Sequence, residues 1–155
     1  DWSMAAEPAI YQDYPKPIRH LSASDGSTLN LGRTRLRFFQ TPGETPGVLS
    51  TRFTVYDNGY PHEAFLFGGA DLNFSGLQQT ELYINSVQRL MQLEGIEVNV
   101  PNHPEFGEIF ERYKILQERE DGDPHSFVDP ESWDAWLELL MLNAQAKLER
   151  ERLAN

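Results

Sequence analysis

The side chains that could carry out chemistry in this sequence are histidines and carboxylates, because the chain contains no cysteine. Thiolate nucleophiles, disulfides and cysteine-bound zinc are therefore excluded, and a metal ion would have to be bound by imidazole and carboxylate groups. The chain has four histidines, and no two of them form an H-x-H or H-E-x-x-H pair, so it has no complete local zinc motif.

His103 differs from the other histidines in its position along the chain. It follows residues 96–100, whose apolar and polar side chains alternate as in a strand. In a sheet covered by helices, polar groups that serve chemistry gather at strand ends. His103 is therefore a candidate functional residue. A surface position is the simpler interpretation for His20 and His62, and a loop or capping role is the simpler one for His125.

The segment 41–47, Thr-Pro-Gly-Glu-Thr-Pro-Gly, is the most unusual string in the sequence. Its two Pro-Gly pairs flank Glu44 and would hold a short connection between two strands rigid, with one side chain directed outward. On composition alone, a stiff connection with an exposed glutamate is the simpler interpretation. A carboxylate placed for function is the alternative.

Alternation of apolar and polar residues predicts five short strands, and helical spacing predicts three helices. Asn58-Gly59 marks a tight hairpin, because both residues tolerate positive φ. Residues 64–67 are apolar on both faces, so we expect them inside a covered sheet. The predicted strands are residues 28–31, 33–38, 49–56, 64–67 and 96–100; the predicted helices are residues 80–94, 106–116 and 130–152, with one further helical turn near residues 3–6.

This order of elements predicts an α/β or α+β fold, in which helices cover one face of a mostly antiparallel sheet. The length of 155 residues fits a single unit over residues 1–155. The other face of such a sheet would still carry apolar side chains, for example from residues 64–67. An exposed apolar patch of that kind marks an interface, so the pattern predicts a partner surface.

The sequence resembles the metallo-β-lactamase superfamily. The segment 41–47, with the pair of strands before it, is similar to the T-P-G-H-T-P-G region of that superfamily, and within the superfamily it resembles the third subclass of metallo-β-lactamases and hydrolases like it. The resemblance extends over nearly the whole chain. Further matching segments are residues 57–59, 67–71, the helix before 102–104, and 126–130.

The resemblance implies an αββα fold, in which two similar halves pack sheet to sheet, and a metal-dependent hydrolase. The family's zinc ligands in this region fall on Glu44, where the family has histidine, and on His103. Asp71 lies near the position of a metal-bridging aspartate in many members. The implied cofactor is one or two zinc ions, which a carboxylate can bind in place of an imidazole.

The family's H-x-H-x-D-H motif has no counterpart in residues 1–155. With the first residue being Asp1 instead of methionine, we expect the chain to be the C-terminal half of a larger metallo-β-lactamase-like domain. The implied activity is attack of a metal-activated water on an ester, lactone, amide or thioester of a small molecule. The alternative is a non-catalytic binding or assembly module that has lost the metal site. The expected partner is the N-terminal half of the same fold or a second copy of this chain.

The net charge of the chain argues against two classes of binding partner. With 13 basic and 24 acidic residues the formal net charge is −11, so the approach of nucleic acid or an anionic membrane starts against a repulsive field. No apolar run approaches the ~20 residues that a membrane-spanning helix needs. We therefore expect neither nucleic acid nor membrane as a partner. The sequence is compatible with a periplasmic or a cytoplasmic location.

Overall fold

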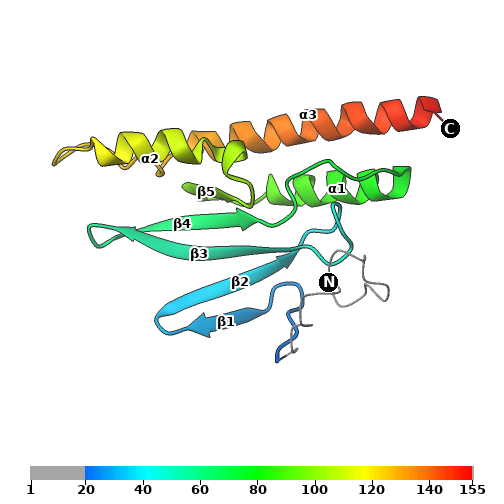
Figure 1. Ribbon diagram of the computed structural model, residues 1–155. Coiled ribbons are helices and arrows are strands. Elements are labelled where there is room, and N and C mark those ends of the chain that lie inside the picture. The colour runs from blue at the N-terminus through cyan, green and yellow to red at the C-terminus, as the bar shows by residue number, and fades with distance from the viewer. Residues whose placement is uncertain (1–19, 155) are drawn as a thin grey trace, which may run out of the picture.

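Residues 20–154, which the computed structural model describes, form one five-stranded sheet with helices packed on it (Figure 1). The helical turn predicted near residues 3–6 lies outside these residues. The strands are β1 (Thr28–Leu31), β2 (Thr34–Gln40), β3 (Leu49–Asp57), β4 (Tyr60–Phe67) and β5 (Val98–Pro101). The helices are α1 (Leu77–Leu90), the short 3-10 helix η2 (Pro104–Gly107), α2 (Ile109–Gln117) and α3 (Pro130–Ala154).

The sheet order is β1-β2-β3-β4-β5, so each strand pairs with its neighbour in the sequence. The first four strands are antiparallel, and β5 runs parallel to β4 after the crossover through α1. The predicted hairpin turn is confirmed: Asn58 and Gly59 both have positive φ, and Asp57 pairs with Tyr60. The predicted α+β class and the mostly antiparallel sheet are likewise confirmed.

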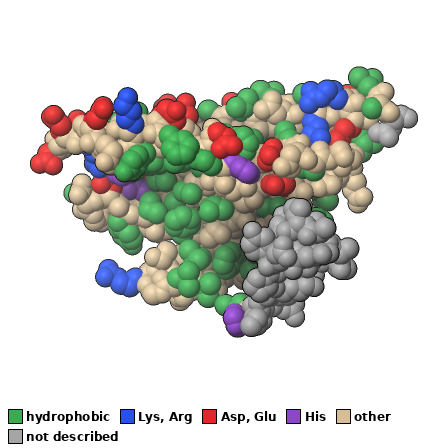
Figure 2. Space-filling view, viewed as in Figure 1, with side chains coloured by type: hydrophobic (Ala, Val, Ile, Leu, Met, Phe, Trp, Pro, Cys, Tyr) green, Lys and Arg blue, Asp and Glu red, His purple; other side chains and the backbone are tan. Residues whose placement is uncertain are grey.

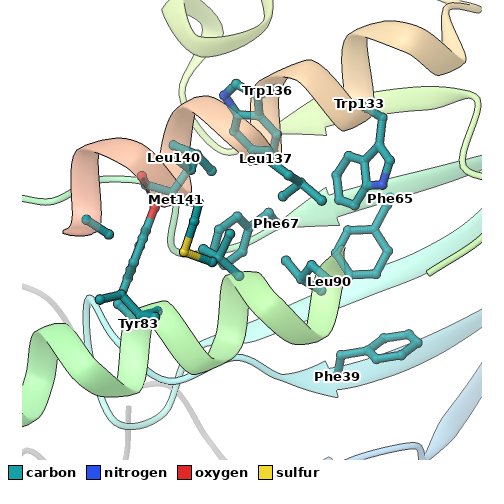
Figure 3. Close-up of a cluster of buried hydrophobic side chains, with 14 of the residues drawn as sticks. Phe39, Phe65, Phe67, Tyr83, Leu90, Trp133, Trp136, Leu137, Leu140 and Met141 are labelled. Atoms are coloured by element: carbon teal, nitrogen blue, oxygen red, sulfur yellow. Dashed lines mark hydrogen bonds between the residues drawn. The ribbon is translucent and has the colours of Figure 1, made fainter. Parts of the chain in front are cut away.

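One face of the sheet is buried under α1 and α3 (Figures 1 and 3). The aromatic rings of Phe65 and Phe67 on β4 are fully buried at the centre of this core. Phe65 packs against Trp133 of α3 with ring centroids 5.1 Å apart, and Phe67 packs against Tyr83 of α1 at 6.0 Å. Strand β4 is therefore inside the sheet and covered on this side, as its apolar sequence predicts.

Helix α3 begins where the sequence predicts. The carboxylate of Asp129 accepts a hydrogen bond from the Ser132 backbone N–H at 3.1 Å, and Pro130 occupies the first helical position. Every residue of the predicted apolar stripe is buried. These residues are Trp133, Trp136, Leu137, Leu140, Met141, Ala144 and Leu148.

The opposite face of the sheet is apolar, and its side chains lie outside the helix-covered core. The register places Phe53 and Val55 of β3 on this face with Leu66 of β4 and Val100 of β5, because Phe53 pairs with Ala64 and Leu66 pairs with Val100. These four side chains are only half-buried. Figure 2 shows hydrophobic side chains gathered across the strands below the helices. We call this surface the open face.

Two helices differ from their predicted bounds. Helix α1 begins at Leu77 and ends at Leu90, so it stops one turn before Gly95, the residue predicted to end it. The helix predicted over residues 106–116 is broken at Glu108, whose φ of 52° interrupts the helix between η2 and α2. The break follows Gly107, where an added Cβ would lie 2.7 Å from the Pro101 ring, so the chain turns tightly against the end of β5. No helix among residues 20–154 is long and apolar enough to cross a membrane.

Candidate functional site

The three predicted site residues lie at the same edge of the sheet. Glu44 is in the loop between β2 and β3, Asp71 follows the end of β4, and His103 follows the end of β5. Because β2 and β3 are antiparallel to each other, β3 and β4 likewise, and β4 is parallel to β5, these strand ends meet at one edge. All three side chains are half-buried.

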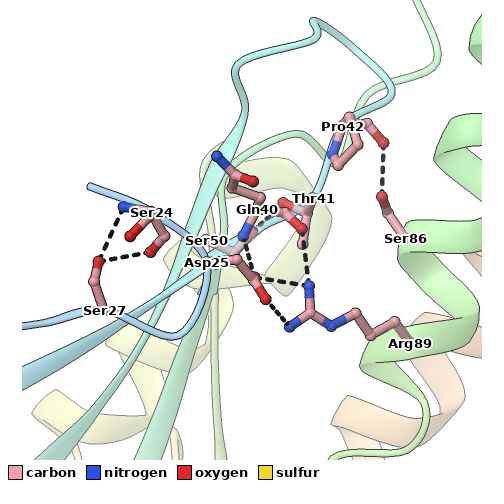
Figure 4. Close-up of polar contacts among 9 residues, drawn as sticks. All are labelled: Ser24, Asp25, Ser27, Gln40, Thr41, Pro42, Ser50, Ser86 and Arg89. Carbon is pink, nitrogen blue, oxygen red and sulfur yellow. Dashed lines mark hydrogen bonds and ion pairs between the residues drawn. The ribbon is translucent and has the colours of Figure 1, made fainter. Parts of the chain in front are cut away.

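The loop that carries Glu44 is held from the sheet side by buried hydroxyl groups (Figure 4). The hydroxyl oxygens of Thr41 and Ser50 lie 2.6 Å apart, and Ser50 Oγ also accepts a hydrogen bond from the Gly68 backbone N–H at 3.1 Å. Thr41 and Ser50 are almost completely buried. This arrangement connects the start of the Glu44 loop to the end of β4.

Helix α1 holds the same loop from the other side. Ser86 Oγ donates a hydrogen bond to the Pro42 carbonyl at 2.7 Å, and Gln79 Nε2 donates one to the Glu44 carbonyl at 2.9 Å. The close approach of loop and helix depends on Gly43, because a Cβ there would lie 2.7 Å from the Cβ of Tyr83. The Pro-Gly pair before Glu44 thus allows contact with α1 as well as stiffening the turn.

A salt bridge adjoins this contact between α1 and the sheet. Both terminal nitrogens of Arg89 donate to the Asp25 carboxylate at 2.8 Å, and one of them also donates to the Gln40 carbonyl at 3.2 Å (Figure 4). The Arg89 guanidinium lowers the pKa of Asp25, and the Gln40 N–H lowers it further. The residue before the Glu44 loop is thereby fixed to the last turn of α1.

Glu44 is not the exposed glutamate that composition alone favours. Its Oε2 atom is buried and has no hydrogen-bond partner among the described residues. Burial raises the pKa of the Glu44 carboxyl, the negative charge of Asp71 raises it further, and His103 lowers it. The fields of Asp71 and His103 therefore reach Glu44, and the structure brings the three predicted residues into one electrostatic neighbourhood.

Asp71 and His103 are positioned by short local contacts. Asp71 Oδ1 accepts a hydrogen bond from the Leu72 backbone N–H at 2.6 Å, and the residue lines a hollow of about 520 Å³ beside α3. The His103 ring packs edge-on against Phe106 with centroids 5.4 Å apart. Next to it, Asn102 donates to the Gly68 carbonyl at 3.1 Å, which joins the loops after β4 and β5.

Metal-binding side chains at this edge do not form a complete site by themselves. Within residues 20–154, no group of three His, Cys, Asp or Glu side chains is close enough to hold a metal ion. A buried carboxylate oxygen without a partner is nevertheless costly in a folded protein, and a bound cation would satisfy it. The carboxylate and imidazole donors at this edge thus fit one side of a metal centre, whose remaining ligands would come from outside the described residues.

The other histidines do not join this edge. His20 is exposed. His62 is half-buried instead of lying on the surface, with its Nδ1 atom 3.3 Å from a carboxylate oxygen of Glu97. Of the two roles expected for His125, the structure shows the loop role, because its Nδ1 atom accepts a hydrogen bond from the Phe127 backbone N–H at 3.2 Å, ahead of the start of α3.

Sequence analysis missed the side chains that support Glu44. Thr41 begins the motif, but its buried partner Ser50 and the helix residues Gln79 and Ser86 carry no motif of their own. The available signal was their position on the helix: residues 79, 83 and 86 lie on one side of α1, and polar residues there interrupt an otherwise apolar stripe.

Comparison with solved structures decides the fold. The subclass B3 metallo-β-lactamase BJP-1 of Bradyrhizobium japonicum superimposes with a TM-score of 0.77 over 90% of this chain, at 22% sequence identity. The native FEZ-1 metallo-β-lactamase of Legionella gormanii gives a TM-score of 0.74 over 83% of the chain, at 23% identity. No protein-family model and no curated protein matches the sequence.

The chain has the fold of half a metallo-β-lactamase. It covers 54% of BJP-1 and 50% of FEZ-1, so it spans about half the length of the solved structures that it matches. The metallo-β-lactamase of Cronobacter sakazakii with the HARLDQ motif shows the same proportion, with a TM-score of 0.73, 19% identity and 52% of its length covered. This coverage is consistent with a C-terminal half of the metallo-β-lactamase fold.

Proposed function

We propose that this chain is the C-terminal part of a metallo-β-lactamase-like hydrolase that uses a metal-activated water. The observation that carries the proposal is the Oε2 atom of Glu44, which is buried, lacks a hydrogen-bond partner among residues 20–154, and lies in the field of Asp71 and His103. A fixed loop holds this carboxylate at the sheet edge, and nothing in the hydrogen bonding of the described fold requires it there.

The residues of this edge would hold the metal from one side. Glu44 and His103 would each donate a ligand atom, and Asp71 would add a second carboxylate near them. A bound zinc ion supplies a water of lowered pKa and polarises a substrate carbonyl. A carboxylate at position 44 brings more negative charge than the family's imidazole, so it would weaken the pull of the metal on that carbonyl.

The substrate class in this proposal is a small molecule with an electrophilic carbonyl, namely an ester, lactone, amide or thioester. The net charge of −11 disfavours a nucleic acid as substrate. Substrate would reach the sheet edge from the side on which Glu44, Asp71 and His103 remain partly exposed.

The proposal includes a partner for the open face. Phe53, Val55, Leu66 and Val100 form a half-buried apolar surface on the side of the sheet away from α1 and α3. The complementary N-terminal half of the fold would bury this surface and bring its own ligands to the Glu44 edge. A second copy of the chain is the other partner that an apolar sheet face of this kind could take.

The test is metal binding by the chain joined to its complementary half, either as one longer polypeptide or as two co-expressed pieces. Metal analysis after dialysis is expected to find stoichiometric zinc, and the His103→Ala variant is expected to lose at least one equivalent. His20→Ala, which removes an exposed imidazole, is the matched control and should keep all the metal. Absence of bound zinc at every pH tested would refute the proposal that the protein is a metal-dependent hydrolase.

The second candidate function is a non-catalytic module that keeps the fold and has lost the metal. Glutamate at position 44, where the resemblance leads us to expect histidine, favours this alternative. The same experiment separates the two. A module of this kind would still associate with the complementary half, but His103→Ala would change neither metal content nor turnover of β-lactams, lactones and thioesters.

A further inference from the structure

A hollow on the helix-covered side of the sheet has no part in the proposed hydrolase. It lies where β5, the corner between η2 and α2, the segment 126–129 and the first turns of α3 meet, and its volume is about 330 Å³. Because α3 covers this side of the sheet, the hollow is separate from the open face. Its size lies at the lower end of the range for small-molecule sites.

The polar group at the floor of the hollow is the side chain of Asn99. Its Oδ1 atom is buried, and the amide forms no hydrogen bond with any of residues 20–154. Most buried polar side chains in folded proteins have a partner, and leaving one without a partner destabilises the fold. An unbonded amide directed toward α3 therefore points to a missing ligand.

Two other polar side chains of the wall, Arg112 and Ser132, already have partners, and a third, Glu108, is exposed to solvent. The Arg112 guanidinium donates to the Ser126 carbonyl at 2.7 Å and to the Asp129 carboxylate at 2.9 Å. Ser132 Oγ donates to the Asp129 carbonyl at 2.8 Å. The positive charge of Arg112 is thus neutralised by Asp129, and Asn99 is the residue of the lining that has a buried polar atom without a partner.

The rest of the lining is apolar and largely aromatic. Phe106, Phe127 and Trp136 contribute rings, and the exposed Leu139 stands at the rim. Flat apolar walls of this kind favour a planar ring, which can pack face or edge against them. A few polar groups among hydrophobic and aromatic side chains is the composition usual for a ligand site.

The backbone beside the hollow is strained. Glu108, at the corner of the lining, has a φ of 52° although it is not glycine. Its side chain forms no capping hydrogen bond to α2 that would offset the strain. Strain of this kind persists where the surrounding structure imposes it, and it concentrates at ligand sites.

We propose that this hollow binds a small, uncharged aromatic molecule that carries an amide-type group. An amide edge presents a donor beside an acceptor, so it can pair with the donor and acceptor of Asn99 at the same time. A cation would find no buried carboxylate in the lining, because Glu108 is exposed, and an anion would approach a chain with a net charge of −11 whose Arg112 is already paired with Asp129. The aromatic ring of the ligand would lie against Phe106, Phe127 and Trp136.

Phe106 connects the hollow to the sheet edge that carries the candidate metal ligands. Its ring lines the hollow and also packs against His103 at 5.4 Å. A ligand that shifts the Phe106 ring would therefore change the magnetic environment of the His103 imidazole. This gives a local signal of binding that depends on neither metal nor enzymatic activity.

Titration of the 155-residue chain with benzamide, followed by NMR, tests the proposal. We expect saturable shifts at Asn99, Phe106 and His103 with a dissociation constant on the order of 1 mM, as suits a ligand of so few atoms. Toluene, which has the ring without the amide, should bind about tenfold more weakly. The same loss is expected for Asn99→Leu, which removes both hydrogen-bonding groups and keeps the number and branching of the side-chain heavy atoms.

Two further variants separate binding from folding. Ala135→Trp places a large side chain into the hollow from an exposed position and should abolish benzamide binding. Leu142→Ala changes an exposed residue of the same helix outside the hollow and should leave binding unchanged. No saturable shifts in the wild type, equal binding of toluene, or full binding by Ala135→Trp would each overturn the proposal, and a buried water alone would then be the partner of Asn99.

Discussion

At the scale of single residues, the unusual group is the carboxylate of Glu44, which the fold makes difficult to ionise. Burial raises the pKa of Glu44, and its Oε2 atom lacks a hydrogen-bond partner among residues 20–154. A residue placed for stability would not be kept in this condition. This cost supports the proposed role of Glu44 as a metal ligand.

Because ionising the buried Glu44 carboxyl costs free energy in the folded state, we predict that Glu44→Gln stabilises the metal-free protein at neutral pH. The pKa of Glu44 is higher in the folded chain than in the unfolded chain, so stability falls as pH rises from the unfolded pKa through the folded one. Removing the charge should therefore raise the free energy of unfolding by about 0.5 kcal/mol at pH 7, after a discount for solvent screening. Urea unfolding at pH 7 and near pH 3.5 measures the difference, which should vanish at the lower pH.

The control for this prediction is Glu105→Gln, which changes an exposed carboxylate on η2. Its stability should match that of the wild type at both pH values. If Glu44→Gln were neutral or destabilising at pH 7, the Glu44 carboxylate would have to be satisfied in a way that the contacts described above do not include.

At the scale of elements, the position of Glu44 depends on contacts between parts of the chain that are far apart in sequence. Gln79 and Ser86 reach the Glu44 loop from α1, 35 and 44 residues away from their partners. Ser50 joins the loop to the end of β4. The loop is therefore one unit with the edge of the sheet and the start of α1.

We expect Ser50→Ala to loosen this unit. The Ser50 hydroxyl is fully buried and bonds to both Thr41 and Gly68, so its removal leaves the Thr41 hydroxyl and the Gly68 N–H without partners. The expected loss is about 1–3 kcal/mol in the free energy of unfolding, read from the midpoint of urea denaturation. Ser75→Ala, at an exposed position, is the matched control and should have no effect. An equally small effect at both positions would contradict the role given to Ser50.

The elements also show what could be predicted from sequence. The strands, the hairpin at Asn58-Gly59 and the start of α3 follow local rules of alternation, turn geometry and capping, and all are confirmed. The break at Glu108 was missed because it results from the contact of Gly107 with Pro101, and a helical pattern within one segment contains no such information. In the same way, Glu44 could be singled out from its motif, but the buried state of its carboxylate comes from the surrounding fold.

At the scale of the whole molecule, one face of the sheet is closed and the other is open. Phe65 lies in the core under α3 and is completely buried, whereas Phe53 on the open face is only half-buried. The two phenylalanines belong to neighbouring strands, so they allow a direct comparison of the two faces.

Substituting each phenylalanine by serine should show how differently the two faces contribute to stability and to association. Phe65→Ser is expected to cost about 3–5 kcal/mol, a large share of the roughly 5–15 kcal/mol that stabilises an ordinary domain. Phe53→Ser should leave the fold intact and should reduce self-association and the binding of a hydrophobic dye. Sedimentation velocity and dye fluorescence on the chain alone provide the measurements. A wild-type chain that is a compact monomer without dye binding would show that its open face needs no partner.

The order of the elements affects how this chain leaves the ribosome. Strands β1 to β4 pair with their sequence neighbours and can assemble early, but the helix that buries Phe65 and Phe67 occupies residues 130–154, the last elements of the described chain to be synthesised. Until α3 emerges, the face of the nascent sheet that carries Phe65 and Phe67 is without its main covering layer. A chaperone that binds unpaired apolar strands would meet its substrate during this interval.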